Sequence, residues 1–145
     1  MTMNETEAAQ IAALLNARNS LTVQYDVRRV MMHASQYRLT QQDGLVVACV
    51  QLRPVQWYQW EVLHLSVHEQ YVRRGLGAAL LAKAIHEASA SGVELLQCTI
   101  RAGNAESEKA FARAGFQKVN SFCNDRSGNV VGVWQCIVPP RRNAS

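Results

Sequence analysis

The chain has 145 residues, of which 15 are Lys or Arg, 11 are Asp or Glu and 4 are His, so its formal net charge is +4. At this length, with 48% hydrophobic residues, a folded chain buries roughly 68–70% of its unfolded surface. Disordered, collagen-like and disulfide-stapled miniprotein classes are therefore excluded, and we expect a single domain over residues 1–145.

The apolar segments are short. The longest uncharged apolar run, Leu45–Val50, has six residues, whereas a membrane-spanning helix needs about 20. The first residues, Met1–Glu7, are acidic where a signal peptide requires a basic start followed by an apolar run. We therefore expect a cytoplasmic protein with no membrane partner.

The cysteines and histidines stand singly, without C-x-x-C or H-E-x-x-H spacing, so we expect buried free thiols and no metal site. The basic residues are scattered in pairs instead of forming a stripe with interleaved aromatics, which argues against a nucleic-acid partner. The four cysteines are Cys49, Cys98, Cys123 and Cys136.

The first half of the chain predicts two helices followed by strands. Apolar residues at helical spacing indicate helices over Glu5–Ala17 and Asp26–Ser35. Asp43-Gly44 is a strong hairpin signal. The strands predicted on its two sides and after them are Gln36–Gln41, Leu45–Val55 and Gln59–Val67.

The second half predicts a strand–helix–strand unit and a final hairpin. A long helix over Gly75–Ala90 is closed by Ser91-Gly92 and followed by a short buried strand, Leu95–Ile100. That order makes the strands on the two sides of the helix parallel. We therefore expect an α+β domain with a mostly antiparallel sheet and about four helices. Its last predicted elements are a helix over Asn104–Ala114 and strands Gln117–Cys123 and Val130–Val138.

The segment between the third strand and the long helix is a candidate anion site. Two glycines let the backbone approach a ligand closely, and the free N–H groups at a helix start favour phosphate. The dinucleotide fingerprint and the Walker loop do not match, because the third glycine of the first and the G-K-[ST] of the second are missing. The segment reads Val72-Arg73-Arg74-Gly75-Leu76-Gly77-Ala78.

A second segment, from Asn104 to Phe116, follows the parallel partner strand. With these two segments the chain resembles the GNAT superfamily of N-acetyltransferases. The family hallmark Q/R-x-x-G-x-G/A is matched at Gly75 and Gly77, with Val72 in place of Gln or Arg. The second hallmark, N-x-x-[SA]-x-x-[LF]-Y-x-x-x-G-F, has Ala112 where the family usually carries Tyr. It is matched at Asn104, Ser107, Phe111, Gly115 and Phe116.

The resemblance implies a mixed sheet of six to seven strands with a splayed parallel pair, acetyl-CoA as co-substrate, and no metal. The pyrophosphate would lie on Val72–Ala78, and an N–H near Leu65 or Ser66 would polarise the acetyl carbonyl. Asn104 is equally explained as a helix N-cap, and Phe111 as a core residue. The other implied cofactor contacts are the backbone of Leu65, Ser66 and Val67 and the residues Asn104, Ser107 and Phe111.

For the catalytic base the resemblance points to Glu61, with His64 as the alternative. Glu61 lies eleven residues before Val72, where the histone-acetylating branch of the family carries its Glu. A Glu needs burial to become an effective base, and Trp57 and Trp60 are candidates for the apolar wall. His64 has a suitable unperturbed pKa, and a bulge in this strand would decide which of the two faces the acetyl group.

The resemblance implies direct acetyl transfer, in a ternary complex, to a primary amine of a small molecule or peptide, and it allows a homodimer. The family's general acid is missing at Ala112. The alternative reading is therefore a non-catalytic acyl-CoA sensor or interaction module that keeps the fold.

Overall fold

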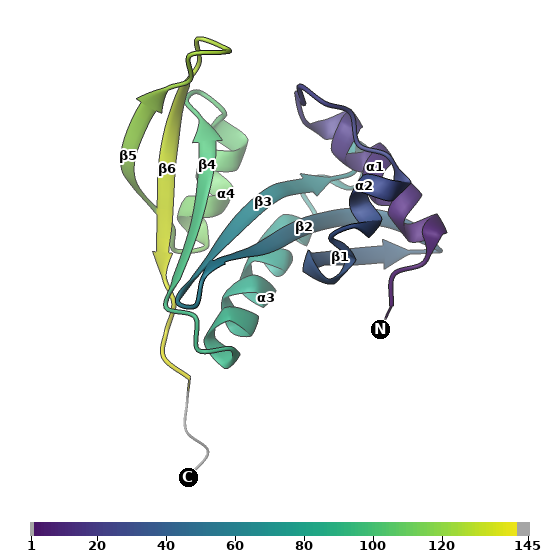
Figure 1. Ribbon diagram of the computed structural model, residues 1–145, viewed down its shortest axis with the longest axis horizontal. Helices are drawn as coiled ribbons and strands as arrows, with labels where there is room; N and C mark the ends of the chain where they lie inside the picture. The colour runs from purple at the N-terminus through teal and green to yellow at the C-terminus, as the bar shows by residue number, and fades with distance from the viewer. Residues whose placement is uncertain (1, 142–145) are drawn as a thin grey trace. The chain divides into compact units, whose positions relative to one another are not determined.

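The computed structural model describes residues 2–141, and in Figure 1 its strands and helices are labelled along the chain. Contacts divide the chain into two compact units. The first holds the chain up to Leu52 together with His64–Leu80, and the second holds Arg53–Leu63 and the chain from Leu81 onward. The elements are α1 (Glu5–Arg18), α2 (Val27–Met31), η1 (Ala34–Gln36), β1 (Tyr37–Gln42), β2 (Leu45–Gln56), β3 (Gln59–Val67), η2 (Glu69–Tyr71), α3 (Leu76–Ala90), β4 (Leu95–Arg101), α4 (Ala105–Arg113), β5 (Gln117–Cys123) and β6 (Val130–Ile137).

The strands form one mixed sheet in the order β1-β2-β3-β4-β6-β5. β3 and β4 are parallel, and β4 pairs antiparallel with β6. The parallel ladder is short: it runs from Gln59 opposite Leu95 to Glu61 opposite Gln97, while β3 continues to Val67. The predicted α+β fold with one parallel pair and four α-helices is thus confirmed. Within residues 2–141, no helix has the length and apolar character needed to cross a membrane.

The core of the first unit lies between α1, α2 and the strands β1 and β2. Helix α1 begins with a capping box, in which the Asn4 side chain accepts from the Glu7 N–H and the Glu7 side chain accepts from the Asn4 N–H. Its apolar stripe is buried against the strands. The buried residues of this cluster are Ala8, Ile11, Ala12, Leu14, Leu15, Val30, Tyr37, Val46 and Cys49.

The second helix is shorter than predicted. The pattern predicted a helix over Asp26–Ser35, but α2 ends at Met31 and a separate 3-10 turn occupies Ala34–Gln36. Asp26 lies before the helix as its N-cap and accepts from the Arg29 N–H at 2.8 Å. Short helices depend on burial for their stability. Val30 is the buried residue of this helix, so burial stabilises little more than one turn.

In the second unit, β4, β6 and β5 lie side by side (Figure 1). One face of β4 and β6 is buried, with Leu96, Cys98 and Cys136 each at most 5% exposed. Phe111 of α4 and Phe116 meet edge to face, with ring centroids 5.0 Å apart. Strand β5 is the outer edge of this unit's sheet, and it is exposed along its whole length.

The expectation of four buried thiols is wrong for one cysteine. Cys49, Cys98 and Cys136 are buried free thiols, whereas Cys123 is exposed at the end of β5. Burial raises the pKa of the Cys49 and Cys98 thiols to about 12, so both stay protonated at neutral pH. Strand β5 reads Gln-Lys-Val-Asn-Ser-Phe-Cys and lies at the edge of the sheet, where exposed polar residues are usual, so Cys123 at its end is left uncovered.

Gly132 on β6 lies where no side chain fits. A Cβ there would be 2.9 Å from Nε1 of Trp134 and 3.3 Å from Cε of Lys118. We expect Gly132→Ala to lower the free energy of unfolding by about 1–3 kcal/mol, because the indole must shift in a packed site. Urea unfolding measures this change. Gly77→Ala is the matched control, since its Cβ would meet side chains only at ordinary 3.7 Å contacts; equal stability of Gly132→Ala and wild type would contradict the prediction.

Candidate functional site

The turn before α3 has the backbone of an anion site. Arg73 and Gly75 both have positive φ, 64° and 78°, and helix α3 begins at the next residue, Leu76. Gly75 adopts this conformation without strain, whereas at Arg73 it costs about 1–2 kcal/mol. Successive N–H groups in such a turn form a concave surface that attracts anions. The two glycines of the predicted motif thus lie on either side of Leu76, the first residue of a 15-residue helix.

The charges at this turn are available to a ligand. Arg73 and Arg74 are exposed, and the Arg74 guanidinium carbon lies 4.8 Å from the ring centroid of Tyr71. This cation–π contact holds the Arg74 side chain beside the turn. The residues here that carry the predicted pyrophosphate contacts are Val72, Arg73, Arg74, Gly75, Leu76, Gly77 and Ala78.

Gly77 joins the turn to the end of β3. A Cβ at Gly77 would be 3.7 Å from Cδ2 of Leu65 and 3.7 Å from Cγ2 of Val67. The first unit therefore brings together the predicted phosphate turn and the strand segment implied to contact the cofactor through its backbone, Leu65–Val67.

His64 interrupts the extended backbone of β3. Its φ is 53°, in the left-handed region, and such a residue in a strand redirects the side chains that follow it, as a bulge does. The Tyr25 hydroxyl lies 3.2 Å from Nε2 of His64, with the two rings edge to face at 5.5 Å. On its other side Tyr25 meets Arg29, whose guanidinium carbon lies 5.2 Å from the ring centroid. His64 thus contacts the segment between α1 and α2 through Tyr25.

Ser66 has its side chain fully engaged within the first unit. Its hydroxyl donates to the carbonyl of His64 at 3.0 Å and accepts from Nδ2 of Asn19 at 2.8 Å. Asn19 also donates to the carbonyl of Leu15 at 2.9 Å. Ser66 as a whole is only 3% exposed, whereas its neighbours Leu65 and Val67 are half-buried.

Glu61 belongs to the second unit, at the last pair of the parallel ladder, opposite Gln97. Burial raises the pKa of the Glu61 carboxyl above its usual range, against the opposing effects of the Arg53 charge and a hydrogen bond from the Gln97 side chain. A carboxylate with a raised pKa is a stronger base at neutral pH. The predicted base therefore has a suitable environment.

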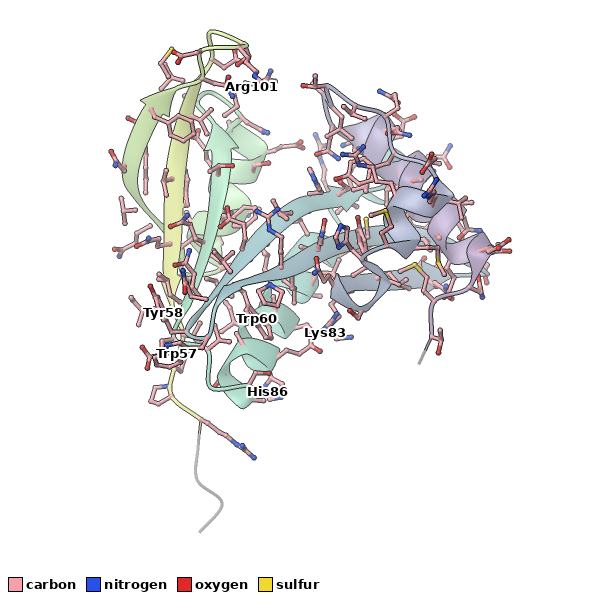
Figure 2. All side chains as sticks on the ribbon, in the orientation of Figure 1. Trp57, Tyr58, Trp60, Lys83, His86 and Arg101 are labelled. Atoms are coloured by element: carbon pink, nitrogen blue, oxygen red, sulfur yellow. The ribbon has the colours of Figure 1, made fainter. Side chains whose placement is uncertain are left out.

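The source of this burial differs from the prediction. Trp57 is 76% exposed and pairs edge to face with Tyr58 at 5.3 Å, and Figure 2 shows both at the turn between β2 and β3. Trp60 precedes Glu61 in the same strand, so its side chain projects to the opposite sheet face. The expectation that these tryptophans wall in Glu61 is wrong, because one is in the turn and the other is on the far side of the strand.

The second hallmark forms the start of α4 in the second unit. Asn104 is its N-cap, and Oδ1 accepts from the Ser107 N–H at 3.3 Å. Ser107 is half-buried, and Ala112, at the position of the family's Tyr, is exposed. Phe111 is 5% exposed and packs against Phe116, which is the core role foreseen as its alternative.

Several residues around these positions carried no signal in the sequence. Tyr25 and Asn19 lie between α1 and α2, and Gln97 and Gln135 lie on β4 and β6, far along the chain from the residues they contact. The first unit also holds a cavity of about 350 Å³ between α1, the start of β2 and the residues after β3. It is lined by Gln10, Ala13, Leu14, Ala17, Arg18, Leu45, Val46, His68 and Glu69.

Comparisons with solved structures show the same fold. The ribosomal-protein-S18-alanine N-acetyltransferase of Escherichia coli is 17% identical, with a TM-score of 0.78 over 100% of this chain and 96% of that one. yncA of Salmonella typhimurium, solved with its cofactor acetyl-CoA, is 16% identical, with a TM-score of 0.83 over the same shares. A GNAT family acetyltransferase of Elizabethkingia anophelis with acetyl-CoA bound is 14% identical, with a TM-score of 0.72 over 86% of this chain and 88% of that one.

The sequence itself carries the family signature. No curated protein matches the chain. The sequence profile of the acetyltransferase (GNAT) family matches residues 7–116, a range that includes both hallmark segments. The chain therefore belongs to the acetyltransferase (GNAT) family.

Proposed function

We propose that the protein is an acetyl-CoA-dependent N-acetyltransferase that acetylates a primary amine. The observation that carries the proposal is the turn before α3, with positive φ at Arg73 and Gly75 and two exposed arginines, in a chain that matches the GNAT family. Two neighbours of the same fold were solved with acetyl-CoA, which supports the same co-substrate for this chain.

The residues present fit such a ligand. The turn offers backbone N–H groups and positive charge to a pyrophosphate. Strand β3 extends past the end of its ladder with β4, and an extended arm with amide groups is recognised by strand backbone of this kind. Asn104 uses its side-chain oxygen to cap α4, which leaves its NH₂ group as a donor. Acetyl-CoA, when bound, supplies an activated acyl group, and N–H groups near Leu65 or Ser66 would stabilise negative charge on its carbonyl oxygen.

We propose that Glu61 removes the proton of the attacking amine. An alkyl amine with a pKa near 10.4 must lose a proton at pH 7, which costs roughly 4–5 kcal/mol. A positioned general base contributes about 10²- to 10⁴-fold in rate. The raised pKa of Glu61 suits this role, and His64 is the alternative base because an imidazole titrates near neutral pH.

The test of this function is transfer itself. The protein is incubated with acetyl-CoA and a panel of amines comprising small primary amines, peptides with a free N-terminus and lysine peptides. Thiol release is followed together with the mass of the product. A product 42 Da heavier, in step with thiol release, is the expected result, and thiol release without any acetylated amine would contradict the proposal.

A second function, a non-catalytic acyl-CoA sensor, is favoured by one observation. Ala112 stands exposed where the family carries Tyr, so the usual proton donor for the departing thiolate is missing. Calorimetric binding of CoA, combined with no transfer to any amine of the panel, would support the sensor instead of the enzyme.

A further inference from the structure

Polar side chains form a row across the sheet of the second unit. Glu61 on β3 lies opposite Gln97 on β4, and Gln97 lies opposite Gln135 on β6. Residues that face each other in neighbouring strands project to the same side of the sheet. The next residues of β4 and β6, Cys98 and Cys136, are buried on the other side. The row therefore lies on the face away from the core of this unit.

Hydrogen bonds connect the three side chains of the row, each donated toward Glu61. Nε2 of Gln135 donates to Oε1 of Gln97 at 2.8 Å. The Gln97 side chain is in turn hydrogen-bonded to Glu61, and an ionised carboxylate can only accept. The Gln97 amide therefore has a single orientation, with its oxygen toward Gln135 and its NH₂ group toward Glu61.

All three side chains of the row are half-buried, so these bonds are only partly replaced by water when they are lost. Two other titratable groups belong to the surroundings of the Glu61 carboxyl. The Arg53 charge from β2 favours its ionised form, and the Cys98 thiol stays neutral, with its own pKa raised to about 12 by burial and by the Glu61 charge.

We propose that Gln97, oriented by Gln135, is a positioning residue that holds the carboxylate of Glu61 in place for proton abstraction. This inference rests on the proposed function, in which Glu61 is the base. Gln97 donates to the charged form, so it also opposes the effect of burial and favours the ionised form of Glu61. Gln135 acts through Gln97, since it prevents the amide from rotating.

The test compares Gln97→Met and Gln135→Met, which keep the length of the side chain and remove its amide. The titration of Glu61 is followed by NMR of its ¹³Cδ nucleus, and the pH profile of kcat is measured beside it. We expect Gln97→Met to shift the titration and the acidic limb of kcat upward together, because the hydrogen bond that favours the charged form is lost. We also expect kcat on the alkaline plateau to fall about 3- to 10-fold, because the ionised carboxylate is no longer held in place. Gln135→Met should shift the titration and the acidic limb in the same direction by less.

Thr99→Val is the matched control, because Thr99 lies on the same strand and the same face, two residues beyond Gln97, and is exposed. Its Glu61 titration should equal that of wild type. An unchanged Glu61 titration in Gln97→Met would overturn the inference, whatever the protein acetylates. If Gln97→Met does not fold, Gln97→Leu and Gln135→Met decide the question by the same titration.

The outcome also separates this inference from the proposed function. If Glu61→Gln leaves acetyl transfer intact, Glu61 is not the base, and a shifted titration in Gln97→Met then shows only that Gln97 holds the carboxylate. If Glu61→Gln abolishes transfer while Gln97→Met leaves both titration and kcat unchanged, the base proposal stands and the positioning role fails.

Discussion

Replacing Glu61 by Gln is expected to lower kcat for amine acetylation about 10²- to 10⁴-fold, the contribution of a positioned general base. Gln keeps the shape and removes the proton acceptor, while the turn at Val72–Ala78 is untouched. The affinity for CoA should therefore remain near that of wild type. Initial rates of product formation and calorimetric titration with CoA measure the two effects separately.

We do not expect the lower kcat of Glu61→Gln to result from loss of folding. Because burial raises the folded-state pKa of Glu61 above its unfolded value, the native state binds this proton more tightly and its stability falls as the pH rises through the two values. Gln carries no charge to desolvate, so Glu61→Gln should be at least as stable as wild type at neutral pH. Glu94→Gln, an exposed carboxylate of the same unit, is the control. Equal kcat in both variants and wild type would shift the role to His64.

Local chemistry made most of the fold predictable. The Asp43-Gly44 turn has positive φ at both residues, 51° and 79°, which is the conformation that this dipeptide favours between two strands. The hallmark glycines likewise predicted the turn before α3, because the positive φ found at Gly75 is a conformation that glycine adopts without strain. The start of α4 was marked by Asn104, a side chain that caps a helix through a contact three residues away.

What the sequence could not predict depends on partners distant along the chain. The Tyr25–His64 contact joins residues 39 positions apart, and the Gln135–Gln97 bond joins residues 38 apart. Neither pair has a motif, because a glutamine or tyrosine in a strand or loop is compatible with many neighbours. The strand register that aligns Glu61, Gln97 and Gln135 is set by the packing of the whole unit. The candidate base was therefore found from the family pattern, while the residues that hold it required the structure.

Gly77→Glu is expected to weaken CoA binding about 100-fold. The substitution places a negative charge in the first turn of α3, beside the N–H groups proposed to bind the pyrophosphate. Two like charges 4 Å apart repel by about 4 kcal/mol at the effective dielectric near a protein surface, and a 100-fold change in Kd requires only about 2.8 kcal/mol. Calorimetric titration with CoA measures the effect, which should decrease as salt is added.

Gly77→Ala and the neutral, equally large Gly77→Gln together separate charge from bulk in this experiment. A Cβ at position 77 would lie 3.7 Å from both Leu65 and Val67, an ordinary contact, so the alanine variant should fold and bind CoA within a few-fold of wild type. A large loss in Gly77→Glu with small losses in Gly77→Ala and Gly77→Gln places the anion at the helix start, because Glu and Gln have the same size and differ in charge. Equal losses in Gly77→Glu and Gly77→Gln would mean that added bulk alone disturbs the packing of α3 on β3. No loss in either would place the pyrophosphate elsewhere, and the proposal of a cofactor site at Val72–Ala78 would then be wrong.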